Sequence, residues 1–145
     1  MNDAAHPSVE RDRPEIHRPV PRVMIADDNP DHVAMTALLL KTEGYDVRGV
    51  PSGTTLLEQF TAFRPHVVIL DIGMPDQTGY DVARSLRASS KGAVVLLIAI
   101  TGHDTQADRW LSRRSGFDHH LAKPADPNTL TAIIRDYLAG NRPTA

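Results

Sequence analysis

The sequence predicts an α/β fold, a doubly wound and mostly parallel sheet of five strands with helices on both faces. Two observations support this prediction. Between residues 22 and 140, short apolar runs alternate five times with stretches of helical spacing. Polar residues directly follow four of these runs, and sheets of this kind bind ligands beyond the carboxyl ends of their strands.

The five strands are expected where apolar residues run together. Their expected ranges are 22–26, 46–50, 67–70, 93–100 and 120–122. The third and fourth runs are continuously apolar, which is typical of strands buried on both faces of a parallel sheet. The run from Ala93 to Ile100 is expected to be the most buried strand.

The helices are expected after each strand. Asn29 caps the first helix and Pro30 lies in its first turn, while Val33, Ala37 and Leu40 form its apolar stripe, which Ala34 and Leu38 widen. Apolar residues at helical spacing place the next two helices around 56–60 and 80–87. The last two helices are expected over 105–115 and from Pro127 to Gly140.

The chain of 145 residues is long enough for one domain with a substantial core. Residues 1–21 are polar and carry four prolines, which predicts a disordered N-terminal tail or linker. The domain is expected over 22–140, followed by a short C-terminal tail at 141–145.

The composition excludes several classes of function. A formal net charge of −2 gives no strong attraction to nucleic acid or an anionic membrane, and Arg109, Arg113 and Arg114 are read as a solvated helix face. The absence of cysteine excludes disulfides, thiolate catalysis and cysteine zinc sites, and it fits a cytoplasmic location. The longest apolar run is too short to span a bilayer, and no secretory signal is evident.

Three carboxylates are expected to meet at one edge of the sheet. Asp27 and Asp28 end the first strand, and Asp71 ends the third. Carboxylates that lie so close repel one another and raise one another's pKa, so a hard cation would stabilise the cluster. Carboxylate and water ligands suit Mg²⁺, with Mn²⁺ as a substitute.

Thr101 and Lys123 follow the fourth and fifth strands. Taken alone, each polar strand-end residue could be a helix cap, a turn residue or a solvated side chain. Their joint occurrence on four strand ends favours phosphoryl transfer, because a carboxylate can attack phosphorus and form an acyl phosphate. A cation, a hydroxyl and an ammonium group would then stabilise the phosphoryl charge.

The motifs resemble those of a known family. The matching segments are 23–28, 68–75 with Gly79-Tyr80, 100–102 and 121–124. In order and spacing, residues 22–139 resemble a receiver domain of the two-component response-regulator family. The resemblance implies the flavodoxin-like strand order 2-1-3-4-5.

The resemblance also implies a role for each site residue. Asp71 would accept the phosphoryl group, and Thr101 and Lys123 would contact it. Mg²⁺ would be bound by Asp28, Asp71 and the Gly73 carbonyl, with Asp27 acting through water. The phosphoryl donor would be a sensor histidine kinase or a histidine phosphotransfer protein. The switching surface, formed by the fourth helix, fifth strand and fifth helix, would contact a downstream protein that the sequence does not identify.

One position departs from the family pattern. Many receivers carry Tyr or Phe three residues before the lysine, as a switch coupled to the threonine, whereas this chain has His120. One interpretation is a surface histidine on a short edge strand. The other is a smaller, titratable switch residue that couples more weakly than Tyr. His103 lies two residues after Thr101, where it could influence hydrolysis of the acyl phosphate.

Two alternative functions remain. An aspartate-nucleophile phosphatase would need a second carboxylate two residues after the nucleophile, but Gly73 occupies that position. A pseudo-receiver would bind partners without phosphorylation, but every acidic, threonine and lysine position is retained. The chain is expected to be a stand-alone receiver or part of a hybrid kinase, since 116–121 resembles receivers of such kinases.

Overall fold

The computed structural model describes residues 19–140. The strands are β1 (Arg22–Ala26), β2 (Asp46–Val50), β3 (Val67–Asp71), β4 (Leu96–Thr101) and β5 (His119–Ala122). The α-helices are α2 (Pro30–Thr42), α3 (Gly53–Phe63), α4 (Gly79–Ala88), α5 (Gln106–Ser115) and α6 (Pro127–Gly140), and η2 (Gly92–Val94) is a short 3₁₀ helix. Most of the predicted N-terminal tail and all of the C-terminal tail lie outside the described residues.

The strands form one sheet in the order β2-β1-β3-β4-β5, and every neighbouring pair is parallel. The predicted α/β class and strand order are therefore confirmed. In this order β1 and the central strand β3 are neighbours in the sheet, although β2 lies between them in the sequence. The strand order thus reverses between them, which is where ligands bind in doubly wound sheets.

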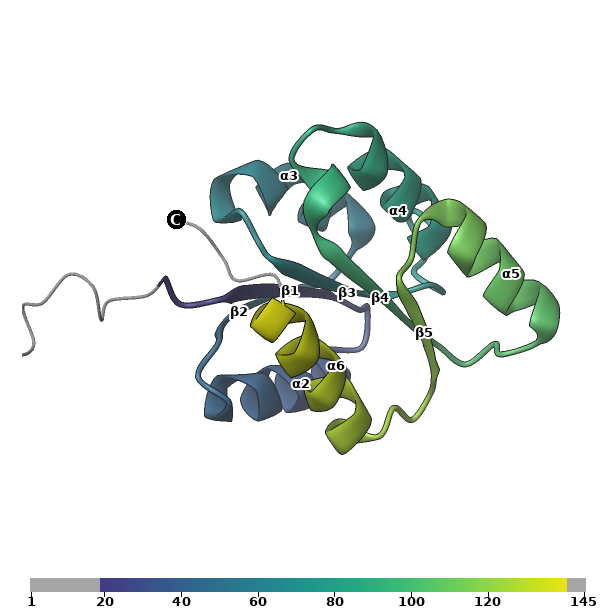
Figure 1. The fold of residues 1–145 in the computed structure, drawn as a ribbon. Helices are drawn as coiled ribbons and strands as arrows, with labels where there is room; N and C mark the ends of the chain where they lie inside the picture. Colours follow the sequence, from purple (N-terminus) through teal and green to yellow (C-terminus); the bar gives the residue numbers. More distant parts are fainter. Residues whose placement is uncertain (1–18, 141–145) are drawn as a thin grey trace, which may run out of the picture.

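Helices cover both faces of the sheet, as Figure 1 shows. Helices α3, α4 and α5 lie on one face, and α2 and α6 lie on the other. Alternate residues of each strand point to opposite faces, so Met24 joins the core beneath α3 and α4 while Ile25 joins the core beneath α2 and α6. The central strands contribute to both cores, which explains their continuous apolar runs.

Side chains cap the starts of the helices, as expected for α2. The Asn29 side chain accepts hydrogen bonds from the backbone N–H groups of Asp31 and His32, and Pro30 is the first residue of α2. Helix α5 begins with a capping box between Thr105 and Asp108. These caps fix where the chain turns from each strand end into the following helix.

The predicted start of the fourth strand is wrong. Gly92–Val94 forms a 3₁₀ helix, and β4 begins only at Leu96. The reason is Arg87, whose guanidinium donates hydrogen bonds to the carbonyls of Gly92 and Val95 and so holds this segment outside the sheet. Val94 is consequently exposed although its sequence context is apolar.

The predicted width of the apolar stripe on α2 is also wrong. Leu40 is buried, and Ala37 packs against the core, as the stripe requires. Leu38 is 65% exposed, and Ala34 is exposed as well. Each of these residues follows a stripe residue by one position, which turns its side chain about 100° around the helix axis and toward solvent.

Candidate functional site

The predicted polar residues meet at the carboxyl edge of the sheet. Asp27 follows β1, Asp71 ends β3, Thr101 ends β4 and Lys123 follows β5. The parallel register aligns the ends of neighbouring strands. Asp71 lies opposite Ile100, and the Lys123 N–H donates to the Thr101 carbonyl at 2.8 Å. Four strand ends therefore contribute to one site.

The three carboxylates form a cluster. One carboxylate oxygen each from Asp27, Asp28 and Asp71 lies within 4.8 Å of the others. Asp27 and Asp71 are buried, whereas Asp28 is exposed. Oxygen ligands of this kind, with one side open to water, suit Mg²⁺ because this cation retains several water ligands. The residues present thus fit a magnesium ion.

Lys123 supplies positive charge to the cluster. Its ammonium nitrogen lies 2.9 Å from Asp71 Oδ2 and 3.8 Å from Asp27 Oδ2. The ammonium group therefore offsets part of the repulsion between the two buried carboxylates. It also lies beside Asp71, where an incoming anionic group would need a positive partner.

Asp27 shows the electrostatic cost of this arrangement. Burial is the main factor that raises the pKa of its carboxyl group above the ordinary value of 3.8, and the negative charge of Asp71 raises it further. A hydrogen bond from the Asn29 N–H and the charge of Lys123 act in the opposite direction. His32 Nδ1 lies 3.5 Å from the same carboxylate, a neighbour that the sequence analysis missed.

Gly73 lies in the loop after β3. Its N–H donates to Asp71 Oδ1 at 3.0 Å, which orients the carboxylate together with Lys123. The two oxygens of Asp71 thus have different partners. The predicted role of the Gly73 carbonyl as a metal ligand stays a prediction.

Thr101 is buried, with an exposed fraction of 1%. Its hydroxyl oxygen accepts a hydrogen bond from the His103 N–H at 3.0 Å. The hydroxyl is therefore bonded to the loop that connects β4 to α5. The predicted role of Thr101 toward a phosphoryl group stays a prediction.

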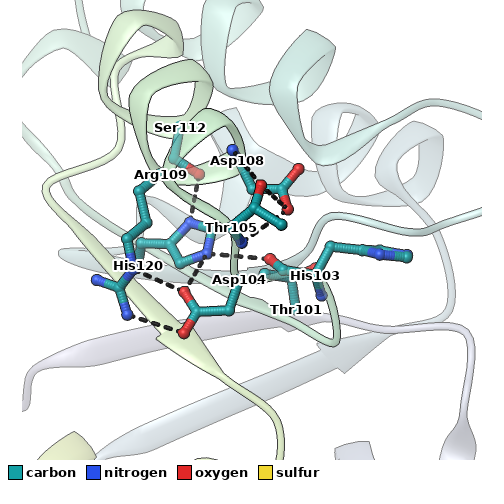
Figure 2. Close-up of polar contacts among 8 residues, drawn as sticks. All are labelled: Thr101, His103, Asp104, Thr105, Asp108, Arg109, Ser112 and His120. Atoms are coloured by element: carbon teal, nitrogen blue, oxygen red, sulfur yellow. Dashed lines mark hydrogen bonds and ion pairs between the residues drawn. The ribbon is translucent and has the colours of Figure 1, made fainter.

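His120 is not the surface histidine that one interpretation assumed, because its side chain is only 7% exposed. Figure 2 shows its ring between α5 and the loop after β4. Nδ1 lies 2.6 Å from Ser112 Oγ, and Nε2 lies 3.3 Å from both the His103 carbonyl and Asp104 Oδ1. Both ring nitrogens therefore have polar partners within the protein.

Sequence reasoning missed Ser112 and Asp104 as partners of His120. Ser112 lies within a polar helix and is buried to 1% exposure, a burial that its sequence context does not indicate. Asp104 belongs to a polar loop and pairs with Arg109 Nε at 2.7 Å. No spacing rule connects either residue with a histidine on the neighbouring strand.

A hollow of about 480 Å³ opens beside the carboxylates, between α2 and the start of α6. Asp71 and Lys123 lie at one side of it. Apolar side chains form much of the rest of its wall, among them Met35, Leu39 and Pro124. The acidic site thus borders an apolar surface.

Comparison with known proteins identifies the family. The family model described as the response regulator receiver domain matches residues 23–135. This chain belongs to the response regulator receiver family. Receiver domains of this family are signalling domains of two-component systems.

Curated relatives agree with this assignment. The DNA-binding response regulator MtrA of Mycolicibacterium smegmatis is 37% identical over 120 residues, which cover 83% of this chain and 51% of MtrA. The receiver chain therefore spans about half the length of that relative. Protein PilH of Pseudomonas aeruginosa is 29% identical over 119 residues, covering 82% of this chain and 98% of PilH.

Solved receiver structures share the fold. The receiver domain of a sensor histidine kinase from Pseudomonas aeruginosa, which holds a magnesium ion in its active-site cleft, is 26% identical with a TM-score of 0.76. The match covers 83% of this chain and 99% of that domain. A CheY-like receiver from Methanospirillum hungatei has a TM-score of 0.78 over 84% of this chain and 96% of that one, at 24% identity. Within residues 19–140, no helix is long and apolar enough to cross a membrane.

Proposed function

We propose that this receiver accepts a phosphoryl group at Asp71 from a phosphohistidine of a sensor histidine kinase or a phosphotransfer protein. The observation that carries the proposal is the placement of the Asp71 carboxylate. It lies 2.9 Å from the Lys123 ammonium and within 4.8 Å of two further carboxylates, at the edge where the sheet binds ligands. We also propose the cytoplasm as its location.

The proposed reaction is a transfer between two nucleophiles. An oxygen of the Asp71 carboxylate attacks phosphorus, a P–O bond forms, and the P–N bond to the donor imidazole breaks. The imidazole leaves with the electron pair of that bond and takes up a proton from solvent. The product is an acyl phosphate on Asp71.

The other site residues would stabilise the charge of the transferred group. Lys123 would pair with one phosphoryl oxygen, and the Thr101 hydroxyl would donate to another after it turns from the loop. Asp28, Asp71 and the Gly73 carbonyl would hold Mg²⁺, with Asp27 bonded through water. When bound, the cation supplies positive charge that offsets repulsion between the phosphoryl group and the carboxylates.

The surroundings of the site suit a protein donor. The hollow beside Asp71 is largely apolar, and the flank of α2 next to it exposes Met35 and Leu38. A partner helix with apolar residues around its phosphohistidine would bury these side chains as it docks. We propose that this surface contacts the donor, and that the face formed by α5, β5 and α6 contacts the downstream target.

Neither alternative is favoured by the site. Gly73 provides a backbone N–H to Asp71 and no carboxylate for the acid–base step of a phosphatase. A pseudo-receiver would not need the ion pair between Lys123 and Asp71 beside two further carboxylates.

A phosphodonor experiment tests the proposal. The protein is incubated with acetyl phosphate and Mg²⁺, and intact mass is measured with and without excess EDTA. We expect one added phosphoryl group in Mg²⁺ and none in EDTA. The adduct should react with hydroxylamine, because an acyl phosphate is an activated carboxyl derivative. A serine or histidine phosphate, or no adduct at all, would contradict the proposal.

A further inference from the structure

A chain of hydrogen bonds connects Thr101 with helix α5. Residue 103 provides the first two contacts, because its N–H donates to Thr101 Oγ1 at 3.0 Å and its carbonyl lies 3.3 Å from His120 Nε2. The other ring nitrogen of His120 lies 2.6 Å from Ser112 Oγ. We name the Thr101–His103–His120–Ser112 chain the polar relay, and Figure 2 shows all four residues.

The partners of His120 determine where its proton lies. Nε2 faces two acceptors, the His103 carbonyl and the Asp104 carboxylate, so it must carry a hydrogen. In the neutral ring, Nδ1 is then an acceptor, and the Ser112 hydroxyl donates to it. The opposite tautomer would place a lone pair against two oxygens.

Burial makes these bonds matter. Thr101 and Ser112 are each 1% exposed and the His120 side chain is 7% exposed, so water has little access to replace the bond between Ser112 and His120. His103 is exposed, so its contact with His120 lies at the surface. The loop itself is held at its far end, where Arg109 pairs with Asp104 and Thr105 caps α5. A displacement at His103 would change its contact with His120, whose other ring nitrogen is bonded to Ser112 in α5.

We propose that the polar relay holds the β4–α5 loop and α5 in the unphosphorylated arrangement, and that it carries the movement of Thr101 to α5. His120 is a positioning residue in this proposal. When Thr101 turns toward a phosphoryl group on Asp71, its bond to the His103 N–H breaks and the His103 carbonyl is freed to move from His120. The proposal rests on the proposed function and deepens it.

The relay differs from coupling by an aromatic ring. If the ring at position 120 only filled space, its coupling to the movement of Thr101 would depend on its size. Histidine, which is smaller than tyrosine, would then couple more weakly. In this chain the ring is already buried and is bonded at both nitrogens. Coupling then depends on hydrogen bonds, and removing one bond should weaken it without removing the ring.

The test uses Ser112→Ala, which removes one hydroxyl from the relay and keeps the helix. Beryllofluoride, a phosphoryl mimic, is titrated with Mg²⁺ and followed by NMR amide shifts. Breaking a bond that holds the unphosphorylated state should favour the other state. We expect Ser112→Ala to bind beryllofluoride about two- to thirtyfold more tightly than wild type, the range found for residues that modulate coupling. Its shift changes over residues 106–115 should shrink relative to those at 71 and 101.

Ser115→Ala is the matched control. Ser115 is also buried in α5, but its hydroxyl accepts from Arg84 at 3.1 Å and takes no part in the relay. We expect wild-type affinity and wild-type shift changes from this variant. Equal behaviour of Ser112→Ala and Ser115→Ala, or weaker binding by Ser112→Ala, would overturn the relay.

A second measurement needs no variant. The nitrogen shifts of the His120 ring report its tautomer, and we expect hydrogen on Nε2 in the neutral form. Hydrogen on Nδ1 would overturn the relay even if Ser112→Ala failed to fold. If wild type binds no beryllofluoride, the proposed function fails and the relay fails with it. If wild type binds but Ser112→Ala changes nothing, only the relay fails.

Discussion

Two neighbouring regions at the carboxyl edge of the sheet are stabilised in opposite ways. The acidic site brings together three carboxylates and one ammonium group, so its charges are not balanced by the protein. The polar relay contains no such excess, because each of its polar groups has a partner. Among the described residues, no buried side-chain nitrogen or oxygen lacks a hydrogen-bond partner.

This difference relates to what each region does under the proposed function. A site that must bind a cation and then an anion keeps unpaired charge in the free protein, at some cost in stability. A region that transmits a conformational change needs two defined arrangements. The hydrogen bonds of the polar relay define the unphosphorylated one. Substitutions in the two regions should therefore have opposite effects on stability.

The largest effect is expected at the phosphoacceptor. Asp71→Asn removes the carboxylate nucleophile, so phosphorylation by acetyl phosphate and Mg²⁺ should be lost completely, as measured by intact mass. Asp46→Asn is a suitable control, because Asp46 begins β2 at the opposite edge of the sheet and is exposed. Full labelling of Asp71→Asn would show that another residue accepts the phosphoryl group.

The next effect concerns the cation. Asp28→Ala removes the exposed carboxylate of the cluster, and Mg²⁺ affinity measured by NMR shift titration should fall about tenfold or more. Asp31→Ala is the control, because Asp31 is exposed in the first turn of α2 and lies outside the cluster. Equal affinities in the two variants would remove Asp28 from the metal site.

The acidic site could be predicted from sequence for a physical reason. In a parallel sheet the carboxyl ends of all strands share one edge, so residues that directly follow apolar runs come together. Asp27, Asp71, Thr101 and Lys123 all have this position, and the structure brings them together. The same reasoning failed at the start of β4, where Arg87 donates hydrogen bonds to the carbonyls of Ala93 and Val95, two residues that the apolar pattern assigned to the strand.

The polar relay could not be predicted in this way. Its bonds connect a loop, a strand and a helix, and they depend on side-chain orientation that no periodicity encodes. Ser112 is a polar residue in a polar helix, so its burial has no counterpart in the hydrophobic pattern. In the sequence, only the position of His120 three residues before Lys123 indicated that this region has a role. The partners of His120 are seen only in the structure.

A smaller effect is expected from His120→Phe, which keeps a ring and removes both nitrogens. The buried Ser112 hydroxyl and the carbonyl of the exposed residue His103 each lose a partner, so the free energy of unfolding should fall by about 1–2 kcal/mol. Urea unfolding in EDTA measures this change. His119→Phe is the control, because His119 is the exposed neighbour on the same strand. A stability of His120→Phe equal to that of wild type would mean that the relay bonds contribute no net stabilisation.

The smallest effect should have the opposite sign. Asp27→Asn removes a buried negative charge beside Asp71, while its amide oxygen can still accept from the Asn29 N–H. At pH 7 and without metal, the variant should be more stable than wild type by about 1 kcal/mol, or about 4 °C in melting temperature. Mg²⁺ should reduce this gain, because wild type then has a cation to offset the charge.

The gain of Asp27→Asn should depend on pH in a defined direction. The folded-state pKa of Asp27 lies above its ordinary value of 3.8, so the folded protein binds the proton more strongly than the unfolded chain does. Wild type therefore loses stability as pH rises from 3.8 through the folded-state pKa, whereas the asparagine variant has no proton to lose there. The difference between them should be absent below pH 3.8 and complete above the folded-state pKa. Thermal unfolding in EDTA across this range measures it. A gain that is constant with pH would arise from packing or hydrogen bonding of the substituted side chain and not from the charge of the acidic site.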